Sequence, residues 1–123
     1  MAELAKALSP GFSVADAEQP RLSFDANMLT VIFREWTEDQ IELQFPACYA
    51  VRWQAVIKLK PEERGDEVLE ITGSKWLADH RNYEAIAPQE PIRHFKLNFN
   101  AWGQLEVLAE DIILARRTSA RGG

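Results

Sequence analysis

Apolar and polar side chains alternate most regularly between His94 and Ala109, on both sides of a turn at residues 100–103. Asparagine and glycine in this turn are typical of a type I turn closed by a left-handed glycine, so the pattern predicts a β-hairpin. The turn sets the register and gives the hairpin one apolar face. The predicted facing pairs are Phe99–Leu105, Leu97–Val107 and Phe95–Ala109 on the apolar face, and Asn98–Glu106, Lys96–Leu108 and His94–Glu110 on the other.

Other segments alternate with the same period of two, which is typical of half-buried strands. On the segment near residue 70, Leu69 and Ile71 are expected to face the core, with Val68 and Glu70 outside. Turn residues separate the strands with almost no helix between them, so we expect hairpin connections and an antiparallel sheet. The expected strands are residues 22–24, 28–36, 41–45, 49–60, 68–71 and the two arms of the hairpin, the second of which could continue through Leu114.

Helical patterns are limited to two places. Residues 1–9 could form two helical turns with Leu4 and Leu8 on one side. Ser74 has the chemistry of a helix N-cap, and a helical stripe of apolar and aromatic side chains follows it over residues 75–83. The members of this stripe are Trp76, Leu77, His80 and Tyr83.

These elements predict an α+β fold, namely a strongly twisted antiparallel β-meander of about six strands with one main helix packed on it. Several expected strands are longer than usual, and long strands coil, so a half-barrel is an alternative form of the same sheet. Residues 1–115 are expected to form a single domain, because a chain of 123 residues has the size of one. The polar, basic residues 116–123 are expected to be a disordered tail.

The composition is that of a globular chain, with 46% hydrophobic and 27% charged residues. No apolar run approaches the roughly 20 residues that span a bilayer, and the first residues lack the basic start and long apolar centre of a signal peptide. Cys48 is the only cysteine, so no internal disulfide is possible. We therefore expect the protein in the cytoplasm and do not expect it at a membrane.

The charge balance narrows the class of partner. The net charge is -5, but Arg116, Arg117 and Arg121 lie in the expected tail, and without them 11 basic and 19 acidic residues leave a charge of -8. A nucleic acid partner is not expected, because phosphate contacts need clustered lysine and arginine. An acidic surface favours a basic protein partner, although acidity also serves solubility alone.

Candidates for catalysis are few. His94 opposite Glu110 could have its imidazole oriented as a general base, or the two could form an ordinary cross-strand pair on a solvated face. His80 shares its helical stripe with Trp76, which favours a half-buried packing histidine. Cys48 has no neighbour that would activate it, so a core position is favoured. No metal-binding spacing, phosphate-binding glycine loop or nucleophile motif is present, so no metal and no cofactor are predicted.

The tryptophan content is the more informative feature, with four in 123 residues. Trp36 and Trp102 lie at or beside hairpin turns, where burial is hardest, and tryptophan flanked by acids is typical of protein interfaces. Together with Glu38, Asp39 and Glu106, they are the predicted partner-binding residues. Alternatively, Trp102 folds back over its own sheet.

Three runs in the second half of the chain resemble small bacterial proteins of unknown function. In those proteins an aromatic strand containing His-Phe or His-Tyr leads into a glycine turn and a strand that ends in Glu-Val-hydrophobic-Ala. Some of them are suspected immunity proteins of bacterial toxin systems. The resemblance implies a cytoplasmic protein that binds and neutralises a toxin, and it carries over no functional residue. The runs are Ser74–Leu77, His94–Asn100 and Gly103–Ala109.

The sequence therefore favours a small non-catalytic protein, immunity-like, that neutralises a basic protein partner through an acidic, tryptophan-bearing surface. The alternative is a coiled-sheet protein that binds a small ligand or performs weak chemistry with His94, Glu110 or His80. Pairing of sheet edges into a homo-oligomer is a third possibility.

Overall fold

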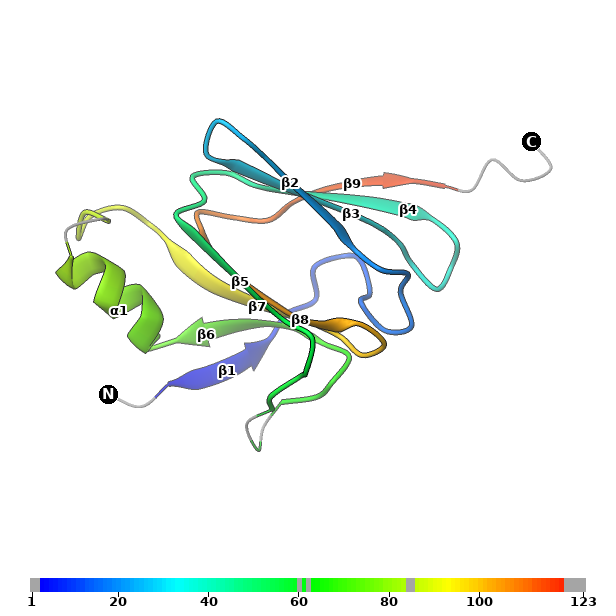
Figure 1. Ribbon diagram of the computed structural model, residues 1–123, viewed down its shortest axis with the longest axis horizontal. Helices are drawn as coiled ribbons and strands as arrows, with labels where there is room; N and C mark the ends of the chain where they lie inside the picture. Colours follow the sequence, from blue (N-terminus) through cyan, green and yellow to red (C-terminus); the bar gives the residue numbers. More distant parts are fainter. Residues whose placement is uncertain (1–2, 60, 62, 84–85, 119–123) are drawn as a thin grey trace.

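Two antiparallel sheets, stacked on one another, make up most of the molecule (Figure 1). The computed structural model describes residues 3–59, 61, 63–83 and 86–118. The first sheet has the strand order β1-β6-β7-β8-β5 and the second β2-β3-β4-β9. The elements are β1 (Leu4–Ala7), β2 (Arg21–Asp25), β3 (Met28–Arg34), β4 (Gln40–Phe45), β5 (Ala50–Gln54), β6 (Val68–Thr72), α1 (Lys75–Asn82), β7 (Arg93–Phe99), β8 (Gly103–Ala109) and β9 (Ile113–Arg117).

The predicted α+β class, antiparallel pairing and single main helix are confirmed over the described residues. The predicted single meander is wrong, because these residues form nine strands in two sheets, and neither sheet closes into a barrel. Each sheet has one apolar face, and stacking two such sheets buries both faces. In the described part of the chain, no helix is long and apolar enough to cross a membrane.

The core lies between the sheets, where apolar side chains of β3 and β4 meet those of β7 and β8. Aromatic rings join the two layers. The ring centroids of Phe33 and Phe99 are 5.2 Å apart, and those of Phe45 and Phe95 are 6.1 Å apart. Their edge-on and tilted arrangements are favoured for aromatic pairs. The apolar face predicted for β7 and β8 is confirmed, and β4 ends at Phe45, where the strand expected over residues 41–45 ends.

The predicted hairpin is present as β7 and β8, but its register differs by two residues from the predicted one. The turn holds only the three residues between Phe99 and Gly103, and Trp102 N donates to Phe99 O across it at 2.8 Å. A shift of two residues keeps every side chain on the same face, so the facing was right although the partners were wrong. The observed pairs are Phe99–Gly103, Asn98–Gln104, Leu97–Leu105, Lys96–Glu106, Phe95–Val107, His94–Leu108 and Arg93–Ala109.

Three segments near the sheet edges also differ from the prediction. Leu4–Ala7 is strand β1 on the edge of β6 and not a helix, because pairing satisfies a backbone that two helical turns alone would barely stabilise. β5 ends at Gln54 and does not continue toward residue 60, which lies outside the described residues. On β6, Val68 packs into the core between the sheets, whereas Leu69 and Ile71 lie on the opposite face, the reverse of the expected facing.

The C-terminal part of the chain is folded further than predicted. β9 pairs with β4 in the second sheet, so it does not prolong β8, and the boundary expected after residue 115 falls inside this strand. Residues 119–123 of the expected tail lie outside the described residues. Arg116 and Arg117 therefore belong to β9 and not to a tail, and the sequence over residues 1–118 carries 13 basic and 19 acidic residues, or -6.

Helix α1 begins where the sequence predicts. Ser74 is its N-cap, and the Ser74 hydroxyl accepts a hydrogen bond from Leu77 N at 3.0 Å. Trp76 and Leu77 pack on a small apolar cluster on the far side of the first sheet from the main core. Tyr83 was expected in the same stripe, but it is 79% exposed. The cluster consists of Ile86, Ile92 and Leu108.

Candidate functional site

A strip of polar side chains is buried on the face of β7 and β8 that points away from the second sheet. The sequence predicted a solvated face here, because polar side chains usually face water. Instead, α1 covers one end, and residues of the β5–β6 connection contact the other. We call this group the polar strip. Its members are His94, Lys96, Asn98, Gln104 and Glu106, each at most 6% exposed.

His94 connects α1 to β8 through both nitrogens of its ring. Nδ1 lies 2.7 Å from Ser74 Oγ, and Nε2 lies 2.7 Å from Glu106 Oε2. Because Ser74 Oγ already accepts the Leu77 amide, the network is satisfied when the hydroxyl donates to Nδ1 and Nε2–H donates to the carboxylate. Arg52 completes the chain with an ion pair of 3.0 Å to Glu106.

Trp76 and Arg52 pack around this chain of hydrogen bonds. The rings of Trp76 and His94 meet edge to face, with centroids 5.2 Å apart. The guanidinium carbon of Arg52 lies 3.9 Å from the centroid of Trp76, a cation–π contact. Arg52 therefore binds both Trp76 and Glu106, and so links β5, β8 and α1.

Glu106 is charged in this network. Burial alone acts to raise its pKa, but the hydrogen bond from His94 and the ion pair with Arg52 lower the pKa below its ordinary value of 4.5. The carboxylate is therefore held by two partners from the chain itself. This arrangement favours a positioning role for Glu106 and contradicts its predicted contact with a partner protein, because its side chain is only 8% accessible.

The other end of the polar strip is bound by the β5–β6 connection. Lys58 O accepts hydrogen bonds from Gln104 Nε2 at 2.9 Å and from Lys96 Nζ at 3.2 Å. Lys96 Nζ also lies 2.7 Å from Glu63 Oε1, which makes an ion pair between two buried side chains. Neither oxygen of Glu63 accepts a well-aligned hydrogen bond from the described residues. The strip thus fastens its covering segments to the sheet.

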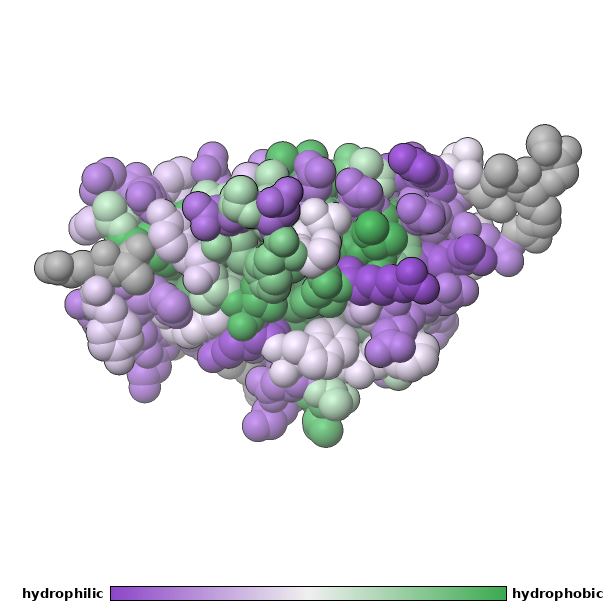
Figure 2. Space-filling view, turned by 45° about the horizontal axis from the view of Figure 1, so that its top comes forward, coloured by the Kyte–Doolittle hydropathy of each residue, from purple (hydrophilic) through white to green (hydrophobic). Residues whose placement is uncertain are grey.

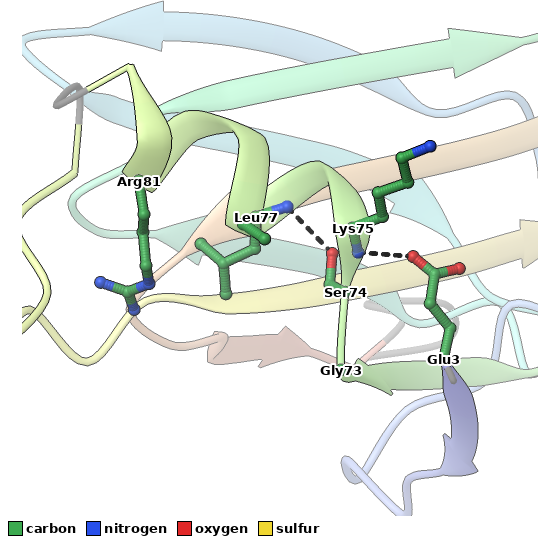
Figure 3. Close-up of a pocket in the computed structure, with 7 residues that line it drawn as sticks. Glu3, Gly73, Ser74, Lys75, Leu77 and Arg81 are labelled. Carbon is green, nitrogen blue, oxygen red and sulfur yellow. Dashed lines mark hydrogen bonds between the residues drawn. The ribbon is translucent and has the colours of Figure 1, made fainter. Parts of the chain in front are cut away.

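A shallow pocket opens beside the N-terminus of α1, and Ser74, although only 7% exposed, is among its lining residues (Figure 3). Lys75, Leu77 and Arg81 line the same pocket. Glu3 approaches from the side of β1, and its carboxylate accepts the Lys75 amide at 2.7 Å. A carboxylate of the chain itself therefore already lies where a helix N-terminus attracts negative charge.

The remaining candidates for chemistry lie outside this chain of hydrogen bonds. His80 is half-buried, and its ring meets Trp76 edge to face at 5.9 Å, which is the packing role the sequence favoured. Glu110 is exposed, and both ring nitrogens of His94 bind other residues, so the predicted His94–Glu110 pair is not formed. Cys48 is half-buried against the main core, and burial raises the pKa of its thiol.

Three segments, two of which contain the predicted tryptophans, meet at one end of the stacked sheets (Figure 1). They are residues 11–18, the β3–β4 turn and the β7–β8 turn. The first segment binds both turns, because Ser13 N donates to Glu35 Oε2 at 2.6 Å and Trp102 Nε1 donates to Ala17 O at 2.9 Å. We call this surface the tryptophan end. Its exposed residues include Asp16, Glu18, Trp36, Glu38 and Trp102.

The two tryptophans are exposed to different degrees. Trp36 is 64% exposed and Trp102 is 43% exposed. Trp102 folds back far enough for its indole N–H to bind Ala17 O. The alternative prediction, that Trp102 folds back over its own sheet, is therefore correct in part. The remainder of its ring lies at the surface. Two large side chains are therefore presented to solvent from a frame that backbone hydrogen bonds hold in place.

Arg116 on β9 binds two carboxylates and one backbone carbonyl of the tryptophan end, and we call this group the Arg116 clamp. Its Nη1 lies 2.7 Å from Glu35 Oε1 and 2.8 Å from Asp39 Oδ2, and its Nη2 donates to Gly11 O at 2.6 Å. Glu35 is only 4% exposed, and burial acts to raise its pKa, but hydrogen bonds from Arg116 and Thr37 help lower the pKa below 4.5. Asp39, a predicted partner-binding residue, is thus also a ligand of the clamp.

Glu38 adopts a left-handed backbone conformation, with φ at 74°. Glycine takes this conformation freely, whereas another residue loses about 1 kcal/mol. The turn around it is well formed, because Glu38 N donates to Glu35 O at 2.8 Å and Glu35 N donates to Asp39 O at 2.9 Å. A glutamate therefore stands at a position of the turn that favours glycine.

Comparison with protein-family models, curated proteins and solved structures gives no match. Among the described residues, no group of three or more histidine, cysteine, aspartate or glutamate side chains is placed to hold a metal ion. The fold and the site define the protein as a two-sheet α+β protein with a buried polar strip and an exposed tryptophan end.

Proposed function

We propose that this chain is a cytoplasmic protein-binding protein that holds a basic partner protein at its tryptophan end. The resemblance to suspected toxin-immunity proteins implies the same kind of role, in which the partner is a toxin and binding neutralises it. The observation that carries the proposal is the exposure of Trp36 and Trp102 on a hydrogen-bonded frame. Trp102 is fixed before binding by its indole hydrogen bond, and an aromatic side chain held in this way loses little entropy, which makes it a typical interface anchor.

The charges around the tryptophans support a basic partner. Asp16, Glu18 and Glu38 are exposed there, with Arg34 as a basic neighbour. Arg116 does not cancel their charge, because two other carboxylates already bind it. Opposite charge on a partner would speed its encounter with this surface and make the binding sensitive to salt.

Glu38 belongs to the same surface. Its side chain is exposed in the β3–β4 turn, two residues after Trp36 in the sequence. The proposal therefore includes Glu38 among the contact residues.

Affinity capture from a lysate of the source cell tests the proposal, with the native chain, Trp36→Ala and Trp102→Ala as baits. We expect a basic protein to be retained at about 50 mM salt and less of it at about 300 mM, because salt screens exposed charges. With the purified partner, each tryptophan variant is expected to bind at least about tenfold more weakly. Isothermal titration calorimetry measures that difference.

Tyr83→Ala is the matched control, because it removes an exposed aromatic side chain at the C-terminus of α1, outside the tryptophan end. It should hold the partner as tightly as the native chain does. Equal binding by both tryptophan variants, or no basic protein captured at either salt concentration, would contradict the proposal.

A second candidate function rests on the alignment of Ser74, His94 and Glu106. A hydroxyl, an imidazole and a carboxylate in series are the groups that activate a serine nucleophile. Ser74 lines the pocket beside α1, but it is only 7% exposed, so a small substrate would need to approach closely to meet its hydroxyl. The cap bond from Leu77 N to the same oxygen weighs against this function, because it helps fix the hydroxyl as part of the helix terminus.

Labelling with a fluorophosphonate probe distinguishes this candidate from a structural serine. An activated Ser74 reacts at a rate that falls at least about tenfold in His94→Gln, because the imidazole removes the proton. Peptide mass spectrometry locates the label, and Ser74→Ala is the blank. A native chain that stays unlabelled excludes activated-serine chemistry at this site.

A further inference from the structure

β2 is an edge strand whose outer side is open. It pairs only with β3 in the described sheet, through five consecutive residue pairs without a bulge. All five of its residues are exposed. Leu22 and Phe24 lie on the face that bears the core, yet they are 36% and 63% exposed. Figure 2 shows apolar surface in the middle of the face turned forward, bordered by hydrophilic residues.

Natural edge strands are usually protected from pairing by lysine, proline, a bulge or a covering segment. β2 contains none of the first three. Its sequence, Arg-Leu-Ser-Phe-Asp, has a further property when it is read against a reversed copy of itself. Arg21 then meets Asp25, Leu22 meets Phe24, and Ser23 meets its own equivalent. Charge and apolarity therefore match at every position of an antiparallel self-pair.

We propose that two copies of this chain associate through β2, with a two-fold axis at Ser23, to join their second sheets into one. Such an interface is isologous, because the same residues serve both copies. The Arg21–Asp25 ion pair occurs twice on the outer face, and the Leu22–Phe24 contact occurs twice on the inner face. The interface adjoins the tryptophan end at Arg21, which lines one hollow with Glu18 and Trp102, whereas Trp36 lines a different hollow.

The free backbone N–H and C=O groups of β2 point in the directions that this pairing needs. Ala26 and Asn27 form a two-residue turn with φ at 47° and 65°, the type I′ geometry of tight hairpins. The pair that flanks such a turn, Asp25–Met28, exchanges hydrogen bonds, and bonded pairs alternate along the ladder. The amide and carbonyl groups of Leu22 and Phe24 therefore point away from β3. In the dimer these two residues face one another and bond.

The same alternation favours the charged pair. If Leu22 and Phe24 are the hydrogen-bonded positions between copies, Arg21 and Asp25 occupy non-bonded positions, where opposing side chains lie closer together. Within one chain these two residues are at opposite ends of β2, so they do not pair with one another. Their complementarity acts only between two copies.

Sedimentation velocity over about 1 μM to about 1 mM protein tests the proposal, because a short strand interface gives a concentration-dependent dimer. We expect a monomer–dimer equilibrium. Arg21→Asp and Asp25→Arg should each raise the dissociation constant of the dimer at least about tenfold, since each places two like-charge pairs in the interface. The exchange variant that carries both substitutions should return to within about threefold of the native value.

The exchange variant makes the result specific to β2, because it restores the charge pairs without restoring the sequence. Circular dichroism of the single variants verifies their fold, which exposed edge positions should leave unchanged. Trp36→Ala should dimerise as the native chain does. The dimer and the proposed partner binding can therefore each be refuted without the other. A chain that stays monomeric throughout, or a dimer that the single variants leave intact, overturns the inference.

Discussion

Replacing His94 with alanine is expected to lower the free energy of unfolding by about 3 kcal/mol. The change takes the Nε2 hydrogen bond from Glu106, which is buried, and the acceptor from the Ser74 hydroxyl. It also removes the ring that Trp76 meets edge to face and leaves a cavity under α1. Urea unfolding followed by circular dichroism measures the loss.

Glu110→Ala is the control for this prediction. Glu110 is exposed, so its truncation should change the free energy of unfolding by less than about 0.5 kcal/mol. Glu106→Ala should instead approach the loss seen for His94→Ala, because the two residues share one hydrogen bond. A destabilising Glu110→Ala with a harmless Glu106→Ala would contradict the observed register and restore the predicted pair.

Arg116→Met is expected to lower the free energy of unfolding by about 2 kcal/mol, a value reduced for the 30% exposure of the arginine side chain. The buried Glu35 carboxylate would lose its ion pair, and Gly11 O would lose its donor. The same urea experiment measures this change. Arg117→Met is the control, because Arg117 is exposed and lies on the opposite face of β9.

The effect of pH on Arg116→Met follows from the pKa of Glu35. That pKa lies below its ordinary value of 4.5, so the folded chain binds fewer protons here than the unfolded chain. The contribution of Glu35 is complete above pH 4.5 and is lost as the pH falls through the folded pKa. Arg116→Met should therefore lose less stability on acidification than the native chain. Equal stability of Arg116→Met and the native chain at neutral pH would contradict the clamp.

Local alternation predicts the facing of β3, β4, β7 and β8 but not their partners, and it gave the wrong facing for β6. The apolar faces of β3, β4, β7 and β8 follow from the period of two, and the Ser74 cap follows from its side chain. The hairpin register was shifted by two because both registers bury the same residues. The division into two sheets depends on the pairs β1–β6, β5–β8 and β4–β9, which join segments without a local pattern.

The candidate site could be predicted only in part, again because a local pattern does not show which segments come together. The exposure of Trp36 and Glu38 follows from their place in a turn, and the structure agrees. Glu106 and His94 were assigned to a solvated face because the sequence does not show that α1 folds over them. The Arg116 clamp was missed because its polar neighbours resemble a tail. The apolar pair that precedes these arginines, Ile113 and Leu114, was the available signal for β9.

Hydrogen–deuterium exchange of the chain, alone and with its captured partner, tests the central claim most directly. If the tryptophan end is the binding surface, amides in residues 12–18, 35–39 and 100–102 will exchange more slowly in the complex, since the partner excludes water there. The outer edge of β2 and the end of α1 will be unaffected in the same samples. Protection confined to β2, or to the pocket beside Ser74, would contradict the account and move the function to that surface.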